Sequence, residues 1–390
     1  MPLPFKTILM KKRQFNLEAW KLIIPALCLV MLSACSNSPS KTAESDTATT
    51  MSADTQITAH MVKPMGPAPE WAPSIKPEML AVIEKLTNYG DKPIEELTAK
   101  EARKNHTPTD AVMDLIKEHN VTLPPSAVDT AGKDIPVAGG NIHLRVYTPQ
   151  ASADGGTFPV IVYYHGGGFV IADLDVYDAS AKGIAEQTGA IVISVAYRLG
   201  PEHKYPTAHT DSYAAYEWAL KNASSINGDP KRIAVAGESA GGNLAVNMAI
   251  MARDKGQTLP IHILAVYPIA QADMNTPSYQ KNAKAKPLNK AMMAWFTKKY
   301  VNTPAEAQGP MISLINANLN GLPPTTIITA EIDPLQSDGM MLIDKLKAAG
   351  VKVESKNYDG VTHEFFGMAA VVPQAKDAQV YAAMRLKEAF

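Results

Sequence analysis

The feature that most constrains the fold is a repeated alternation of strand-length apolar runs with helical stretches after about residue 125. Continuous apolar runs lie at 158–164, 190–196, 232–237, 262–267 and 325–330, and 141–147 alternates as a half-buried strand does. Helical patterns lie between them at 176–188, 210–221, 240–253 and 338–349, and a last strand at 351–358 precedes a last helix at 374–390. Strands that are apolar on both faces and alternate with helices predict an α/β fold, with a mostly parallel sheet flanked by helices.

The first 35 residues have the pattern of an export signal. A basic segment that includes Lys11 and Lys12 precedes an apolar run at 22–32, which is shorter than the ~20 residues that span a bilayer. The run ends in Leu-Ser-Ala-Cys, which resembles the bacterial lipobox, so 1–35 is predicted to be a lipoprotein signal peptide that is lipidated on Cys35. We expect an exported protein anchored by lipid to a membrane, at the bacterial outer membrane or the periplasmic face. An uncleaved signal anchor is the alternative.

The segment between the signal and the first strand has two parts. Residues 36–66 are rich in Ser, Thr, Ala and Pro and poor in large apolar groups, so they are predicted to be a flexible tether. Residues 67–124 contain helical apolar spacing and predict N-terminal helices, either as a cap or as packing on the main domain at 125–390. The segment 278–300, between two predicted strands, is a candidate for a second cap segment.

Composition excludes several functional classes. Lys and Arg number 37 against 38 Asp and Glu, so there is no electrostatic case for a nucleic-acid partner. The only cysteines are Cys28 and Cys35, both within the predicted signal. The main domain therefore has neither a thiolate metal site nor a cysteine nucleophile.

One motif stands where a strand should pass into a helix. Gly237-Glu-Ser-Ala-Gly241 follows the apolar run at 232–237 and opens the helical stretch at 240–253. Glycines permit a tight turn, and a helix N-terminus favours developing negative charge. Ser239 is therefore predicted to be a nucleophile, with a plain glycine-rich turn as the alternative. Glu238 is either a buried partner of a neighbouring group or a turn residue, and we assign it no proton transfer.

A second glycine motif, His165-Gly-Gly-Gly168, ends the strand predicted at 158–164. Glycines leave backbone N–H groups free and close to a substrate, as a tetrahedral oxyanion requires. Gly167 and Gly168, with Ala240 after the nucleophile, are the predicted oxyanion hole. Gly166 completes the motif, and His165 is expected to orient the loop. A flexible loop is one alternative, and a phosphate-binding loop is disfavoured because apolar residues follow instead of Lys-Ser/Thr.

A serine nucleophile needs a base, and only His262 and His363 follow Ser239 in the chain. A nucleophile of this strand–turn–helix type is followed first by its acid and then by its histidine. His262 begins a predicted strand and comes before the acid. His363 lies in a predicted loop at 359–367 just after the last strand, so it is the predicted base.

The acid is expected just after the strand at 325–330, within 331–335. Asp333 is the predicted acid, which would hold the imidazole in one tautomer and stabilise its positive form. Glu331 and Asp338 are the alternatives. Glu331 could be a solvated charge at the strand end, and Asp338 fits better as the N-cap of the next helix.

Together these motifs resemble the bacterial hormone-sensitive-lipase-like esterases, which have the α/β-hydrolase fold. The resemblance covers residues 67–390 and rests on 165–169, 197–206, 237–243, 321–325, 333–335, 346–351 and His363. It implies an eight-stranded sheet, a helical cap and no cofactor or metal. It also implies a serine carboxylesterase that hydrolyses short- to medium-chain acyl esters through an acyl-enzyme on Ser239.

The alternatives to that activity use the same site. A deacetylase or amidase and a lipase would share the triad and differ in the pocket, whereas a non-catalytic binding protein on a hydrolase scaffold is a remote alternative. Related esterases often form homodimers, so a homodimer is among the partners that the resemblance implies. The chain departs from the family where Glu364 follows the histidine, because the family often has His-Gly-Phe. Arg198 and Asp211 are expected to form a structural ion pair.

Overall fold

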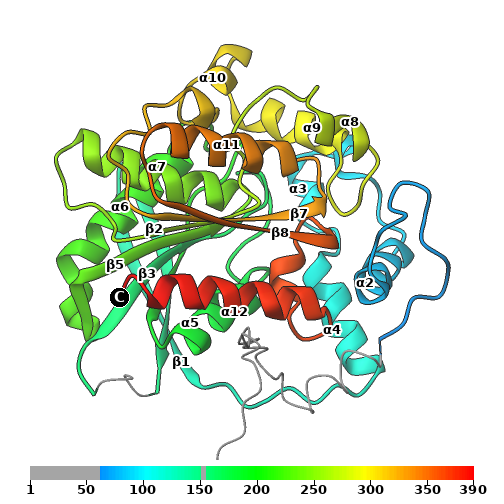
Figure 1. The fold of residues 1–390 in the computed structure, drawn as a ribbon, viewed down its shortest axis with the longest axis horizontal. Helices are drawn as coiled ribbons and strands as arrows, with labels where there is room; N and C mark the ends of the chain where they lie inside the picture. The colour runs from blue at the N-terminus through cyan, green and yellow to red at the C-terminus, as the bar shows by residue number, and fades with distance from the viewer. Residues whose placement is uncertain (1–61, 151–154) are drawn as a thin grey trace, which may run out of the picture. The chain divides into compact units, whose positions relative to one another are not determined.

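The computed structural model describes residues 62–150 and 155–390, so the predicted signal peptide, Cys35 and nearly all of the tether lie outside the described residues. The described part is organised around one eight-stranded sheet with the order β1-β2-β4-β3-β5-β6-β7-β8 (Figure 1). Strand β2 is antiparallel to both β1 and β4, and every other neighbouring pair is parallel. The predicted fold class is therefore confirmed.

The strands are β1 Val128–Val137, β2 Gly140–Pro149, β3 Phe158–Tyr164, β4 Ile191–Ala196, β5 Gly228–Glu238, β6 Ile263–Val266, β7 Thr325–Ile332 and β8 Val353–Thr362. Helices cover both faces of the sheet (Figure 1). One apolar cluster joins the sheet to α6 Thr207–Asn222, α7 Ala240–Asp254 and α11 Gln336–Ala348. The other joins it to α5 Asp178–Thr188 and α12 Pro373–Lys387. The short helix η2, Ala223–Ile226, leads into β5.

Two details of the sheet differ from the sequence prediction. Strand β1 was not predicted, because most of its side chains are exposed and its sequence shows no apolar alternation. It forms because its backbone pairs along its whole length with β2. Strand β8 continues to Thr362, so His363 follows the strand directly and does not lie in a loop that starts at 359.

The N-terminal helices are α2 Pro77–Asn88, η1 Ile94–Glu96, α3 Ala99–Ala102 and α4 Pro108–Glu118. Helix α4 begins at a capping box of Thr107 and Asp110 with proline in its first turn, which satisfies the free N–H groups there. The segment around η1 and α3 reaches the neighbourhood of the glycine motif. Arg103 Nε donates to Val170 O at 2.8 Å, and Trp295 Nε1 donates to Leu97 O at 3.0 Å.

The chain between β6 and β7 carries α8 Pro277–Lys281, α9 Lys290–Tyr300, α10 Pro304–Gln308 and η3 Leu314–Asn316. The predicted insertion at 278–300 corresponds to α8 and α9. After β8, the short helix η4, Phe365–Met368, leads to α12. Within the described ranges, the search for a helix with the length and hydropathy to cross a bilayer found none.

Candidate active site

The turn between β5 and α7 holds Ser239 in an unusual backbone conformation, with φ 56° and ψ −116°. The two flanking glycines permit this turn, because a Cβ on Gly237 would lie 2.2 Å from Gly241 O and a Cβ on Gly241 would lie 1.8 Å from Tyr164 O. The Ser239 N–H donates to Val266 O at 2.9 Å and ties the turn to the end of β6. The sequence motif therefore produces a strained elbow that depends on its glycines and lifts the serine out of the sheet.

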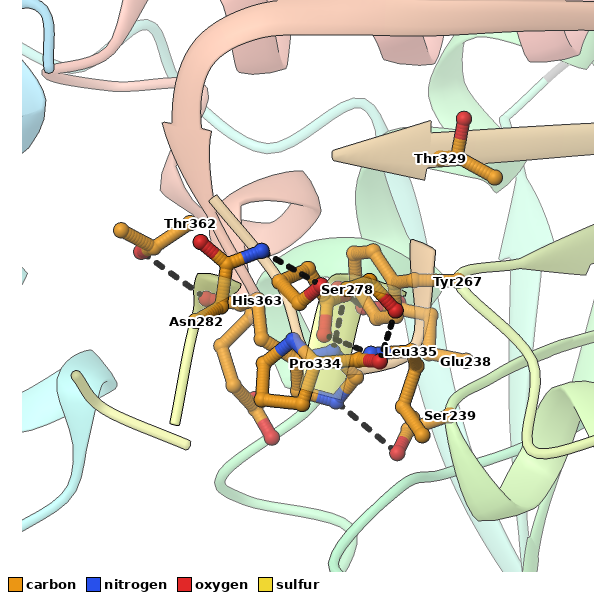
Figure 2. Close-up of polar contacts among 12 residues, drawn as sticks. Glu238, Ser239, Tyr267, Ser278, Asn282, Thr329, Pro334, Leu335, Thr362 and His363 are labelled. Carbon is orange, nitrogen blue, oxygen red and sulfur yellow. Dashed lines mark hydrogen bonds and ion pairs between the residues drawn. The ribbon is translucent and has the colours of Figure 1, made fainter. Parts of the chain in front are cut away.

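His363 lies between Ser239 and Asp333. Figure 2 shows His363 beside Ser239, with a dashed line between the two side chains. Its Nε2 is 2.9 Å from Ser239 Oγ, and its Nδ1 is 2.7 Å from Asp333 Oδ2. Asp333 is fully buried, and its other oxygen accepts the Leu335 N–H at 2.8 Å. The structure thus brings together the three predicted residues from the ends of β5, β7 and β8, in the geometry that a nucleophile, base and acid require.

The surroundings of His363 favour its charged form. Burial acts to lower the pKa of His363, but the Asp333 carboxylate beside Nδ1 outweighs burial, and the pKa lies above its ordinary value. An imidazole that accepts a proton from the serine hydroxyl is therefore stabilised as the imidazolium.

The alternative acids lie elsewhere. Glu331 accepts the Ser74 hydroxyl at 2.9 Å and the Gly360 N–H at 2.8 Å, so it is not the solvated strand-end charge that we considered. The N-cap interpretation of Asp338 is wrong, because α11 is capped by Leu335 and Asp338 is buried in the first turn. Its carboxylate accepts the N–H groups of Ala270 and Gln271 at 3.0 and 3.2 Å, and burial raises its pKa to about 7.

The His165–Gly168 loop follows β3, beside the elbow. Gly167 and Gly168 have φ values of 89° and 59°, which favour glycine. Among the described residues, neither N–H donates to a backbone carbonyl. A Cβ on Gly168 would lie 2.4 Å from the Phe296 ring, so α9 packs closely on the loop. Ala240 is the first residue of α7, directly after the nucleophile.

His165 orients this loop and does not act as a base in this geometry. Its Nδ1 is 2.8 Å from Gly166 O, and its ring stacks on Tyr197 at 4.3 Å between centroids. Tyr197 also donates to His165 O at 2.8 Å. Burial lowers the pKa of His165 to about 4, so the ring is neutral near pH 7. Burial does the same for His262, whose Nε2 is 2.9 Å from the Thr326 hydroxyl.

Sequence reasoning missed a buried polar group behind the nucleophile helix. His209 has Nε2 at 3.1 Å from Asn243 Oδ1 and Nδ1 at 3.0 Å from the Tyr300 hydroxyl. Asn243 also donates to Ile269 O and Ile312 O, both at 3.0 Å. The only signal was Asn243 itself, two residues beyond the second glycine of the elbow motif. The group fixes α7 to the segment that follows the insertion. The predicted Arg198–Asp211 ion pair is also present, at 2.7 Å.

A small apolar pocket lies next to the glycine loop. It has a volume of about 20 Å³ and is lined by Gly168, Phe169, Ile269, Gln271, Ala272, Met274, Met293, Phe296, Thr297, Tyr300, Val301 and Ile312. A water needs ~10–15 Å³ on the same measure, so the pocket has room for only one or two small groups.

The fold, the elbow and the contacts among Ser239, His363 and Asp333 are those of an α/β-hydrolase that uses a serine. A family model described as alpha/beta hydrolase fold matches residues 161–367. The chain belongs to this family, in the hormone-sensitive-lipase-like group, and is a carboxylic ester hydrolase.

Similar proteins carry names that agree with this class. The chain is 43% identical over 253 residues to a carboxylesterase of Mycobacterium tuberculosis. The matched region covers 64% of this chain and 79% of that relative. It is 31% identical over 252 residues to an ethyl acetate hydrolase of Pseudomonas putida, with coverages of 64% and 79%. A solved thermostable esterase from Pseudomonas putida has a TM-score of 0.74 at 32% identity, covering 81% of this chain and 98% of the other.

Proposed function

We propose that this chain is a serine carboxylesterase that hydrolyses short-chain acyl esters through an acyl-enzyme on Ser239. The observation that carries the proposal is the continuous contact from Ser239 Oγ to His363 Nε2 and from His363 Nδ1 to Asp333. The Ser239 oxygen bonds to the ester carbonyl carbon while its proton passes to His363 Nε2. Asp333 holds the imidazole with Nε2 toward the serine and stabilises the imidazolium.

The oxyanion forms where backbone N–H groups are free. Gly167, Gly168 and Ala240 would donate to it, and a helix N-terminus at Ala240 favours the same negative charge. His363 then gives its proton to the leaving alcohol as the carbon–oxygen bond breaks, which leaves the acyl group on Ser239. A water that loses a proton to His363 attacks the acyl carbon, and the acid leaves as the serine regains its proton.

The pocket beside Gly168 favours short acyl chains over the long chains of a lipase substrate. Its volume of about 20 Å³ has room for only a short acyl tail, and Phe296 is one of the side chains that line it. A similar protein from Pseudomonas putida is named for the hydrolysis of ethyl acetate, which supports the same substrate class. A deacetylase would fit the same pocket, so the alcohol portion decides between these two activities.

The decisive experiment measures kcat/KM for p-nitrophenyl esters from acetate to decanoate, with Ser239→Ala assayed in parallel. We expect acetate to butyrate to be preferred and the Ser239→Ala variant to lose turnover by about 10⁶-fold. Hydrolysis that persists in the Ser239→Ala variant would contradict the mechanism. A rate that rises steadily to decanoate would contradict the short-chain preference and favour a lipase.

We also propose that the enzyme is exported and anchored to a membrane by lipid on Cys35, which lies outside the described residues. The basic segment, short apolar run and Leu-Ser-Ala-Cys sequence support this proposal. Radiolabelled palmitate should label the full chain and not a Cys35→Ala variant, with loss of the variant from the membrane fraction. Equal labelling of both proteins would contradict the anchor.

A further inference from the structure

Two carboxyl side chains stand beside the triad without a role in the mechanism above. Glu238 directly precedes Ser239, and Glu364 directly follows His363. Both line one cavity of about 1250 Å³ on the α5 and α12 side of the sheet, which is distinct from the pocket that Phe296 lines. Within residues 62–150 and 155–390, the ion pairs found include neither carboxyl. Carboxyls without a cation are costly to bury, so their contacts call for an explanation.

Glu238 is connected to the catalytic histidine through an aromatic ring. Its buried carboxylate accepts the hydroxyls of Tyr163 and Tyr267. The Tyr267 ring packs on the His363 imidazole, with 4.5 Å between centroids. Figure 2 shows Tyr267 and Glu238 next to the serine and histidine. Burial raises the pKa of Glu238 to about 7, and the charge of Glu364 acts in the same direction.

Glu364 is connected to the oxyanion loop. Its carboxylate accepts the Tyr177 hydroxyl at 2.7 Å. That hydroxyl lies 2.1 Å from where a Cβ on Gly166 would stand, so it packs directly on the loop backbone. Tyr177 thereby joins the residue after the base to the loop that supplies the predicted oxyanion donors.

The backbone of Glu364 is left-handed, with φ 70° and ψ 1°. Glycine adopts this conformation without strain, whereas a side chain is disfavoured. The glutamate here therefore carries a backbone cost that the Tyr177 contact and the charge beside His363 offset. Backbone strain next to a catalytic residue indicates that the side chain at the strained position has a function.

We propose that Glu364 is a positioning residue for ester hydrolysis, in which its carboxylate supports the His363 imidazolium and, through Tyr177, holds the His165–Gly168 loop in place. This inference rests on the proposed roles of Ser239 and His363. The two functions of Glu364 can be separated, because one needs its charge and the other needs only an acceptor for the Tyr177 hydroxyl.

Several titratable groups face the same region. Asp333 lies on the other side of His363, and Tyr163, Tyr177 and Tyr267 contact the two carboxyls. The cavity that both carboxyls line also includes Asp178, Lys182, Glu186 and Lys376. Asp178 is bonded to Arg145 and Tyr147, and Glu186 accepts the Ala127 N–H. Of these acidic groups, Glu364 is the one that directly follows His363 in the chain. The test therefore removes the charge of Glu364.

The experiment compares pH profiles of kcat/KM for p-nitrophenyl acetate. His363 must be neutral to accept the serine proton, so activity falls as pH falls through the pKa of His363. Glu364→Gln keeps an acceptor for Tyr177 and removes the negative charge. The imidazolium then loses support, and the acid limb should move to lower pH by about half a unit.

The matched variants test each connection alone. Tyr177→Phe keeps the carboxyl group and breaks the link to the loop, so kcat should fall by roughly tenfold with little change in KM. Its acid limb should move less than that of Glu364→Gln, because the variant loses only the Tyr177 hydroxyl that stabilises the ionised Glu364. Glu238→Gln should move the limb in the same direction as Glu364→Gln but by less, because Glu238 acts on His363 more weakly. Glu364→Gly removes charge and acceptor together on a backbone that suits glycine, so it should show both effects in a folded protein.

An acid limb of Glu364→Gln that superimposes on that of the wild type would overturn the inference, as would a larger shift in Glu238→Gln. Changes confined to the melting temperature would show that Glu364 is only structural. Failure of the underlying function looks different, because the wild-type protein would then lack the turnover that Ser239→Ala abolishes.

Discussion

We predict that Phe296 on α9 limits the length of acyl chain that the enzyme accepts. Its ring packs on Gly168 of the glycine loop and lines a pocket of about 20 Å³. In Phe296→Ala this wall is removed, and a chain that stops at the ring in the wild type can extend into the space. Each buried methylene contributes about 0.8 kcal/mol, so two further methylenes contribute about 1.6 kcal/mol. That difference corresponds to about 15-fold in kcat/KM.

The assay is the ratio of kcat/KM for p-nitrophenyl hexanoate to that for the butyrate. We expect Phe296→Ala to raise this ratio by about 10- to 20-fold, mainly through the hexanoate. Lys298→Ala is the matched control, because Lys298 lies on the same helix, is exposed and does not line the pocket. Its ratio should equal that of the wild type.

The variant must remain folded for the ratio to be informative. Removing a buried phenylalanine side chain costs about 3–5 kcal/mol, so thermal unfolding should be measured alongside the kinetics. Phe296→Leu removes less volume and should give a smaller rise in the ratio at a smaller stability cost. An unchanged ratio in a folded Phe296→Ala protein would refute the assignment of this pocket to the acyl chain.

Three further predictions concern the acid of the triad, the carboxyl beside the nucleophile and a glycine of the elbow. Asp333→Asn should lower kcat by about 10⁴-fold with the fold retained, because the imidazole of His363 would then be held in the wrong tautomer; circular dichroism beside the kinetics checks both parts. Glu238→Gln should flatten the pH dependence of stability. Burial raises the pKa of Glu238 to about 7, so its ionisation between about pH 5 and about pH 8 lowers the unfolding free energy of the wild type by about 2.5 kcal/mol. Urea unfolding at both pH values measures the difference, and a variant with the wild-type slope would contradict it. Gly241→Ala should give little soluble protein, because its Cβ would lie 1.8 Å from Tyr164 O; a soluble, active variant would show that the elbow tolerates a side chain.

The sequence predicted the strands whose side chains are buried on both faces of the sheet. Strands β3 and β4 lie between helices on both faces, so their runs of buried valine, isoleucine and tyrosine are visible as continuous apolar segments. Strand β1 could not be found in this way. Its side chains are mostly exposed, and it is held by main-chain pairing to β2, which leaves no apolar pattern in the sequence.

The sequence predicted the parts of the site in which the local backbone requires one residue type, or in which the chain offers few candidates. The glycines around Ser239 are needed by the elbow itself, and the chain offers only two histidines after it. Chain order could not distinguish Asp333 from its acidic neighbours, and only the contact with His363 separates them. The position of Asp338 was misjudged for the same reason: an acidic residue near a helix start suits an N-cap, but Asp338 binds the N–H groups of a segment far away in the chain.

The long-range part of the site follows from the order of the parallel strands. Since β5, β6, β7 and β8 are neighbours, their carboxyl ends lie along one edge, and residues 124 positions apart in the chain come into contact there. The residue just beyond β6 is Tyr267, whose ring packs on His363 while its hydroxyl reaches Glu238. A tyrosine after a strand carries no catalytic pattern in sequence, yet the strand order makes it a neighbour of both the serine elbow and the base. The same argument places Glu364, the second residue after β8, beside the triad, where it accepts the hydroxyl of Tyr177 from the N-cap of α5. These neighbours of the triad are set by the order of the strands and not by any sequence motif.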